Sequence, residues 1–320
     1  MNAVKTNLTF KPDREDIEAI MILARNRIPH SLGQGHDHPR SWSGFVAAPD
    51  SEPIMKNMAK AQHQLGSLGA GNHFIEMQYG DDGRVWLMIH SGSRGLGHNT
   101  ATYYNKQAAI WCDENEVKLP AKGLAYLPME HKLGQEYYDA MTFCIDYAAE
   151  SRKRMMETFL DCVFDVFSDV KGIQQIDLSH NFAREEEHYG KKLMVHRKGA
   201  TFAGEGSWGI IPGSMGTKSY IVRGKGNPES FNSCSHGAGR TMSRTAAKNG
   251  KKDVHGTVLI EALDFEEQRD LLKDVVHGMD SVKKLDEAPG AYKNIGVVMG
   301  NQTDLIDIEV ELTAIGNIKG

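Results

Sequence analysis

Apolar side chains recur every three or four positions across residues 135–167, the longest such pattern in the chain. This spacing puts them on one face of a helix, which predicts a long helix buried along that face. Across residues 180–244 the chain is instead rich in glycine and serine, and its apolar residues form short runs at 193–195, 210–211 and 220–222 that are typical of strands. The two patterns together predict an α+β fold.

Shorter patterns predict further elements on both sides of this long helix. Residues 13–26 carry apolar side chains at helical spacing, and residues 33–43 form a polar loop. Apolar runs at 74–77 and 85–89 flank the turn Gly80-Asp81-Asp82-Gly83, which predicts a hairpin.

Helices and strands are also expected where capping residues or apolar runs stand near the middle and the end of the chain. A helix capped by Asn99 or Thr100 is expected to run through Trp111. The tail predicts a helix near residues 265–276 and strands around Val297 and residues 306–312. Because no repeat or clear linker interrupts the 320 residues, one domain over residues 1–320 is expected.

The four cysteines lie far apart, and no Cys-x-x-Cys pair occurs among them. This spacing implies neither a disulfide framework nor a zinc knuckle. The first residues lack the apolar segment of a secretory signal, and no apolar run approaches the roughly 18–20 residues of a membrane span. These features predict a cytoplasmic protein without a membrane partner.

Positive charge is concentrated in the middle of the chain. Residues 191–252 hold twelve lysines and arginines against two acidic residues, although the whole chain has a net charge of −5. The negative total argues against a protein that coats nucleic acid with its whole surface. The basic segment suggests a localised anion site, and a solvated basic face is the alternative.

Several of the fourteen histidines stand in loops that contain glycine, serine or asparagine and adjoin short apolar runs. Four of them are of this kind: His73, His90, His180 and His236. Loops at strand ends can hold side chains rigidly while leaving them accessible. Converging neutral imidazoles would bind a transition metal, whereas each histidine taken singly is as well explained by a structural or surface role.

Glycine-rich loops and arginines suggest phosphate binding. Residues 66–71 and 211–217 offer backbone amides, but neither loop matches a Walker A or dinucleotide-binding fingerprint, and a tight turn explains both. Arg94, Lys198 and Arg240 stand beside the histidine loops, and arginine suits bidentate binding of phosphate. Surface charge is the alternative, and it is the stronger one for Lys248, Lys251 and Lys252.

In their order along the chain, these segments resemble the RtcB family of RNA-splicing ligases. Six segments carry the resemblance: residues 65–76, 90–95, 180–181, 195–200, 211–216 and 233–240. The likeness continues through residues 291–293 to the terminal residues 318–320 and so covers essentially the whole chain. It implies one RtcB-like catalytic domain in which mixed β-sheets, flanked by helices, surround a central pocket for metal and nucleotide.

The resemblance also implies an activity and roles for individual residues. The activity is a GTP- and Mn²⁺-dependent joining of an RNA 3′-phosphate or 2′,3′-cyclic phosphate end to a 5′-hydroxyl end, in tRNA splicing or RNA repair. His236 would carry the guanylate, and a neutral imidazole is a competent nucleophile once the phosphate charge is neutralised. The implied Mn²⁺ ligands are His73, His90 and His180. The residues implied to contact the guanine base or the rest of the nucleotide are Asn72, Glu76, Asn181, Ser214, Met215, Ser219, Tyr292 and Lys319. The residues implied to face phosphates are Arg94, Lys198 and Arg240.

One departure from the family concerns a segment that ends in Asp-x-x-Cys-Gly. In the family this segment lies upstream of the part that Met1-Asn2-Ala3 resembles, and its Asp and Cys bind the metals. The chain is therefore expected to be a natural short form, a product with a misplaced start, or one piece of a split enzyme whose missing segment a partner peptide supplies. Without that segment the three histidines are expected to hold one Mn²⁺. The alternatives to an active ligase are an inactive RNA- or nucleotide-binding relic and a metal-dependent phosphohydrolase.

Overall fold

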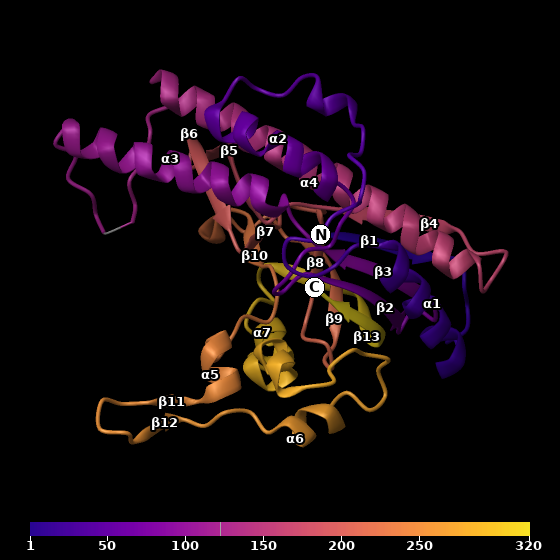
Figure 1. Cartoon of the computed structure of the whole chain (residues 1–320). Coiled ribbons are helices and arrows are strands. Elements are labelled where there is room, and N and C mark those ends of the chain that lie inside the picture. Colours follow the sequence, from indigo (N-terminus) through magenta and orange to yellow (C-terminus); the bar gives the residue numbers. More distant parts are fainter. Residues whose placement is uncertain (122) are drawn as a thin grey trace.

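The computed structural model describes residues 1–121 and 123–320, and its centre is a seven-stranded sheet (Figure 1). The strands follow the order β4-β1-β3-β2-β13-β9-β8, and each pairs with its neighbours in antiparallel fashion. Their bounds are β1 Asn2–Thr6, β2 Phe74–Gly80, β3 Val85–His90, β4 Gly172–Asp177, β8 Trp208–Ile211, β9 Ser219–Gly224 and β13 Ile306–Lys319. The expected hairpin is confirmed as β2 and β3, which turn at Gly80–Gly83.

Three smaller pairs of strands lie outside the central sheet, and all are antiparallel. They are β5 Asn181–His188 with β6 Lys191–Lys198, β7 Ala200–Phe202 with β10 Ser233–Ser235, and β11 Lys251–Lys252 with β12 Val258–Ile260. In the described part of the chain, parallel pairing is confined to the isolated bridge between Val276 and Gly316. The mixed pairing implied by the family resemblance therefore reduces to this one bridge.

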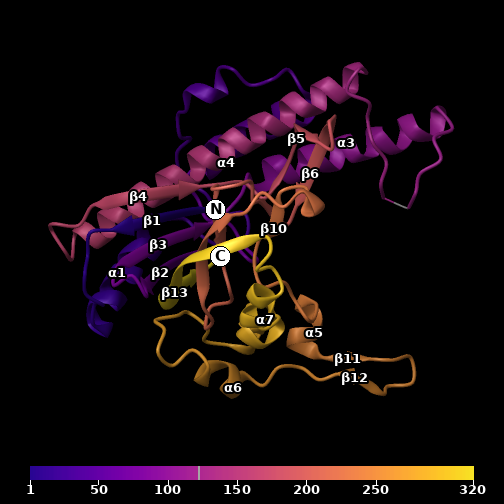
Figure 2. The ribbon, with the colours of Figure 1, turned by 180° about the vertical axis from the view of Figure 1, so that it is seen from behind.

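Helices lie on both sides of the sheet, as the views in Figures 1 and 2 agree. The long helices α2 Glu52–Gln64, α3 Arg94–Glu114 and α4 Lys132–Phe164 pack together on one side, and α1 Arg14–Arg27 lies beside the end of α4. The short helices α5 Arg244–Asn249, α6 Phe265–Asp270 and α7 Ile295–Gly300 lie on the other side. Single 3₁₀ turns are η1 Ser43–Phe45, η2 Pro228–Ser230, η3 Val282–Glu287 and η4 Pro289–Ala291. The α+β class predicted from the sequence is confirmed.

The largest part of the hydrophobic core lies between the sheet and the pair α1 and α4. Ile20 of α1, Phe159 of α4 and Leu87 of β3 are each 0% exposed. The apolar period of residues 135–167 is therefore satisfied by α4, which packs on β1 and β3. This packing fixes the positions of strands β2 and β3, whose ends carry two of the candidate histidines.

Three expectations about element bounds are wrong or partly wrong. Helix α3 begins at Arg94 rather than at Asn99. Thr100 therefore lies inside the helix, where its hydroxyl donates to the carbonyl of Leu96 at 2.9 Å instead of capping. The helix expected over residues 265–276 ends at Asp270, because the backbone of Val276 bonds to β13. Val297 lies in helix α7, where the side chain of Asn294 accepts from its N–H.

None of the helices in residues 1–121 and 123–320 is both long enough and apolar enough to cross a membrane.

Candidate active site

Four histidines from distant parts of the sequence form a row at the ends of strands. His73 stands directly before β2, His90 ends β3, His180 stands directly before β5, and His236 follows β10. Ring centroids are separated by 5.8 Å between His73 and His90, by 5.1 Å between His90 and His180, and by 5.1 Å between His180 and His236. The last two rings are stacked, with an interplanar angle of 19°. The structure thus brings together the four histidines that the sequence singled out.

Burial keeps these imidazoles uncharged. Loss of solvation lowers the pKa of His73 from 6.5 to about 4 and that of His180 to about 3. It also lowers the pKa of His90 and that of His236. Nδ1 of His73 lies 2.8 Å from the carbonyl oxygen of Leu68, so that nitrogen carries the proton and Nε2 keeps its lone pair. At neutral pH the row therefore offers lone pairs rather than positive charges.

The donor chemistry of His73, His90 and His180 fits a divalent transition metal. Neutral imidazole is a ligand for such ions, and the buried Nδ1 of His180 has no hydrogen-bond partner among the described residues. Over residues 1–121 and 123–320, no three histidine, cysteine, aspartate or glutamate side chains already stand in a ligating arrangement. The three histidines are therefore suitable by protonation state and proximity, and ligation requires their side chains to turn.

A half-buried arginine lies beside this row. Arg94 adopts a left-handed backbone conformation with φ 57°, and its Nη2 donates to the carbonyl of Gln34 at 3.1 Å. A Cβ on Gly69 would stand 1.7 Å from Nη1 of Arg94 and 2.7 Å from Nδ1 of His73, so glycine is required for this approach. Nε of Arg94 is buried and has no hydrogen-bond partner among the described residues. An anion beside His73 would supply an acceptor for this group.

The ring of His236 rests against a second glycine. Gly199 has φ 65°, and a Cβ there would lie 3.1 Å from Cε1 of His236. The N–H of Gly199 donates to Oδ1 of Asn181 at 3.0 Å and to the carbonyl of His180 at 2.9 Å. Asn181 therefore holds the loop that the ring of His236 contacts. The sequence did not predict this positioning role.

A buried carboxyl group and a lysine share one face of neighbouring strands β2 and β13. Glu76 is 2% exposed and pairs across the strands with Asn317, whose Nδ2 donates to it at 2.6 Å; the Nε2 of Gln78 also donates to Glu76. Burial raises the pKa of Glu76 to about 7. Nζ of Lys319 lies 5.2 Å from the ring centre of Phe74. Burial lowers the pKa of Lys319, and the attraction of the Glu76 carboxylate partly offsets this effect. Glu76 and Lys319 therefore lie on the same face of two paired strands.

Glu287 contacts four of the surrounding side chains, and no sequence pattern indicated its role. Its carboxylate lies 3.2 Å from Arg240, 2.7 Å from Arg244 and 3.8 Å from Lys319, and it accepts a hydrogen bond from the hydroxyl of Tyr292. Burial alone would raise its pKa, but Lys319, Tyr292 and Arg244 outweigh burial and lower it. Because Arg240, Arg244 and Lys319 are all distant from Glu287 in the sequence, no local spacing marks Glu287.

Replacing Glu287 with glutamine is expected to destabilise the protein. Lys319 would remain largely buried without its counter-charge, and such a loss costs about 2–3 kcal/mol once the partial exposure of the arginines is considered. Urea unfolding of Glu287→Gln should show this decrease in the free energy of unfolding. The control is Glu309→Gln, which removes a partly exposed partner of Arg223 and should change that free energy by less than about 0.5 kcal/mol. Equal stability of the two variants would contradict the assignment.

The remaining predicted contact residues occupy several environments. Asn72 and Lys198 are exposed, whereas Ser214, Met215 and Ser219 are buried in or beside the loop 212–218. Ser214 bonds to Thr217, and Oγ of Ser219 accepts from the N–H of Gly213 at 3.2 Å. No contact among the described residues joins Ser219 to Glu76 or Lys319, so its visible role is to hold the loop. Tyr292 and Arg240 stand together, with the guanidinium carbon 4.9 Å from the ring centre.

The basic segment at residues 191–252 forms no uniform basic face. Several of its cations pair with carboxylates elsewhere in the chain; these pairs are Arg197–Glu186, Lys218–Glu311, Arg223–Glu309, Lys225–Asp307, Arg240–Glu287 and Lys248–Asp286. Lys198 forms no ion pair within residues 1–121 and 123–320. Part of the local excess of charge is thus paired with carboxylates within the folded chain.

Comparison with known proteins identifies the family of the chain. Residues 2–320 match the family described as tRNA-splicing ligase RtcB. The chain is 34% identical over 346 residues to the RNA-splicing ligase RtcB of Escherichia coli (strain K12), with 100% of this chain and 81% of the relative covered. It is 32% identical over 388 residues to the tRNA-splicing ligase RtcB of Thermococcus kodakarensis, with 99% and 78% covered. For the protein of that name in Archaeoglobus fulgidus the identity is 35% over 321 residues, with 88% and 64% covered.

A match over almost the whole chain classes the protein as an enzyme of the RNA ligase type. The chain belongs to the RtcB family. The resemblance found in the sequence is thereby confirmed.

Proposed function

We propose that residues 1–320 act as one catalytic domain that joins RNA ends with GTP and Mn²⁺ through a guanylate carried on His236. The observation that supports this most directly is the stacked pair His180 and His236, 5.1 Å apart, in which a neutral imidazole stands beside a candidate metal ligand. The histidine row adjoins the Glu76 and Lys319 pair through β2, since His73 is followed directly by Phe74, on which Lys319 packs. Nucleophile, candidate ligands and a candidate base-binding pair thus belong to one site.

In the first step a ring nitrogen of His236 attacks the α-phosphorus of GTP. The bond from that phosphorus to the bridging oxygen breaks, and pyrophosphate leaves. The guanylate then passes from the nitrogen to an oxygen of the RNA 3′-phosphate. The 5′-hydroxyl oxygen of the second RNA end attacks the phosphorus of that 3′-phosphate, its proton is lost, and GMP leaves. A 2′,3′-cyclic phosphate is first opened by water to the 3′-phosphate.

Different side chains would bind the metal, the phosphates and the guanine base. His73, His90 and His180 would hold Mn²⁺, which when bound supplies Lewis-acid stabilisation of phosphate charge. Arg94, with its buried Nε lacking a partner among the described residues, would face a phosphate. Glu76 would accept from the N1 and N2 donors of guanine, and Lys319 would donate to its O6. Asn72, Asn181, Ser214, Met215, Ser219, Tyr292, Lys198 and Arg240 complete the proposed nucleotide and phosphate contacts.

The ligation itself can be tested by following the junction phosphate. One RNA oligonucleotide carries a labelled 3′-phosphate and the other a 5′-hydroxyl, and both are incubated with the protein, GTP and Mn²⁺. We expect a joined product in which the label resists phosphatase, because the junction phosphorus comes from the 3′-phosphate. A phosphohydrolase would instead release labelled inorganic phosphate, and a binding protein would leave both strands unchanged. Either of these results would reject the proposal. Chelation of the metal should stop the joining.

A further inference from the structure

Two adjoining cavities lie between helices α3 and α4 and the β5–β6 hairpin, and the first of them reaches the site described above. Their volumes are about 410 Å³ and about 430 Å³. Five residues line both of them, namely Ala101, Tyr137, Met141, Ala183 and His196. The two cavities are therefore parts of one groove, which we call the helix–hairpin groove.

One end of the helix–hairpin groove is at the histidine row. His180, Asn181 and Lys198 line the first cavity, and His180 stacks on His236 at 5.1 Å. Among the described residues, neither Glu76 nor Lys319 lines either cavity. The groove thus shares a histidine with the site of phosphate chemistry but is separate from the pair that would hold the guanine base.

The charge of the groove suits a polyanion. No aspartate or glutamate of the described chain lines either cavity, although the protein has 42 acidic residues and a net charge of −5. Arg152, Arg197 and Lys198 line the end near His180. Arg152 and Arg197 are paired with carboxylates, whereas the exposed Lys198 has no ion pair in residues 1–121 and 123–320. The groove thus presents one cation without a partner and no acidic side chain. This combination favours binding of a phosphodiester backbone over binding of an acidic protein surface.

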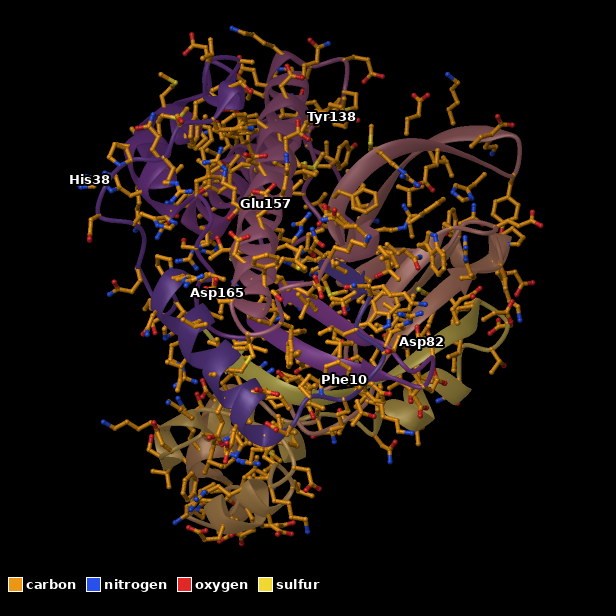
Figure 3. All side chains as sticks on the ribbon, turned by 90° about the vertical axis from the view of Figure 1, so that its right-hand side faces the viewer. Phe10, His38, Asp82, Tyr138, Glu157 and Asp165 are labelled. Atoms are coloured by element: carbon orange, nitrogen blue, oxygen red, sulfur yellow. The ribbon has the colours of Figure 1, made fainter. Side chains whose placement is uncertain are left out.

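Aromatic side chains line the rest of the groove. Phe182 stands in the first cavity, Tyr126 and Tyr138 in the second, and Tyr137 in both. Tyr126 is 50% exposed and Tyr138 partly exposed, so their rings are accessible. Tyr138 stands near the start of α4 on the side of the hairpin (Figure 3). Flat rings beside a cationic end are the combination by which proteins hold single-stranded nucleic acid, with bases stacked on aromatic side chains.

We propose that the helix–hairpin groove holds the nucleotides of single-stranded RNA next to the end that reacts at the histidine row. This inference rests on the proposed ligase function and names where its RNA lies. The cavity near His180 would take the sugar and phosphate nearest the reacting end, beside Lys198. The second cavity would take the following base against Tyr126 and Tyr138. Each cavity has the size of sites that hold small molecules, about 300–1,000 Å³.

The test measures RNA binding without GTP or metal, by fluorescence anisotropy of single-stranded oligonucleotides. One probe ends in a 3′-phosphate and the other in a 5′-hydroxyl. Tyr126→Ala and Tyr138→Ala should each weaken binding of at least one probe by about tenfold, because each removes one stacking partner. The matched control is Tyr189→Ala, which removes an exposed tyrosine at the turn of the same hairpin, outside the groove, and should leave the affinity unchanged.

Lys198→Ala should also reduce the salt dependence of binding. Loss of one phosphate contact to a single strand lowers the slope of log affinity against log salt by about 0.7. The matched control is Lys192→Ala on the same strand, where the lysine pairs with Glu185 and lies outside both cavities. Comparison of the two probes assigns the groove to the 3′-phosphate strand, the 5′-hydroxyl strand or both, and each of these outcomes supports the proposal.

Two results would overturn it. Folded Tyr126→Ala and Tyr138→Ala proteins that bind both probes as tightly as the unaltered protein would show that RNA lies elsewhere. A photoreactive 4-thiouridine probe that labels peptides other than those of α3, α4, the loop with Tyr126 or the hairpin would show the same. Since binding is read without nucleotide, His236→Ala should retain RNA affinity; failure of guanylylation is therefore distinguishable from failure of the groove.

Discussion

His236→Ala is expected to abolish covalent labelling by GTP that carries its label on the α-phosphate, with a decrease of at least about 10³-fold. No neighbouring group can take over, because Ser235 is a far weaker nucleophile at neutral pH and its hydroxyl donates to the carbonyl of Gly237 at 2.6 Å. The unaltered protein should form an adduct that is labile to acid and stable to base, as a phosphoramidate on histidine is. Gel analysis after each treatment reads the result directly.

The variant should fold normally, because His236 is only partly buried and forms no ion pair among the described residues. His255→Ala is the matched control, since His255 is exposed on the turn between β11 and β12, away from the histidine row, and should label as the unaltered protein does. Undiminished labelling of His236→Ala would reject the nucleophile. Loss of labelling in both variants would show that the effect is not specific to His236.

Glu76→Gln is expected to remove much of the preference for GTP over ATP. In the proposed site the carboxylate would accept from both donors of the guanine edge, whereas a glutamine would accept from only one of them. One buried polar group left without a partner costs about 1–3 kcal/mol, or roughly 5–150-fold in selectivity. Competition of ATP, ITP and GTP for labelling measures this. ITP lacks the N2 donor and should bind the unaltered protein less tightly than GTP does. The Glu76→Gln variant should bind ITP and GTP about equally.

The same carboxyl group should make GTP binding depend on pH near neutrality. Burial raises the pKa of Glu76 to about 7, above its ordinary value of 4.5. The acceptor form is therefore present above pH 7 and is lost as the pH falls through 7, so GTP affinity should decrease between pH 8 and pH 6. Binding favours the charged form, so protons should be released on binding near pH 7, as calorimetry in buffers of different ionisation enthalpy can detect. In Glu76→Gln both effects should disappear; their persistence would assign the titration to another group.

Local sequence patterns were sufficient for the elements that bury a regular apolar face. The helical period of residues 135–167 became α4, and the apolar runs on either side of Gly80–Gly83 became the β2–β3 hairpin. Such patterns work because period and burial are linked within one segment. They failed at Val297, where capping by Asn294 forms a helix whose Val297 side chain is 60% exposed. They also failed at residues 271–276, where turns lead to an isolated bridge between Val276 and β13.

The candidate histidines were marked by their loops, and the family resemblance assigned their roles, but only the fold decided how they meet. His73 and His236 are far apart in sequence. They belong to one row because β2 and β5 begin, and β3 and β10 end, at the same place. Tertiary burial, which no local pattern encodes, lowers the pKa of the histidines and raises that of Glu76. The role of Glu287 likewise depends on its long-range pairs with Arg240, Arg244 and Lys319. The sequence thus determined which side chains are available for the chemistry, and the packing of distant segments determined their distances, their protonation and the groove beside them.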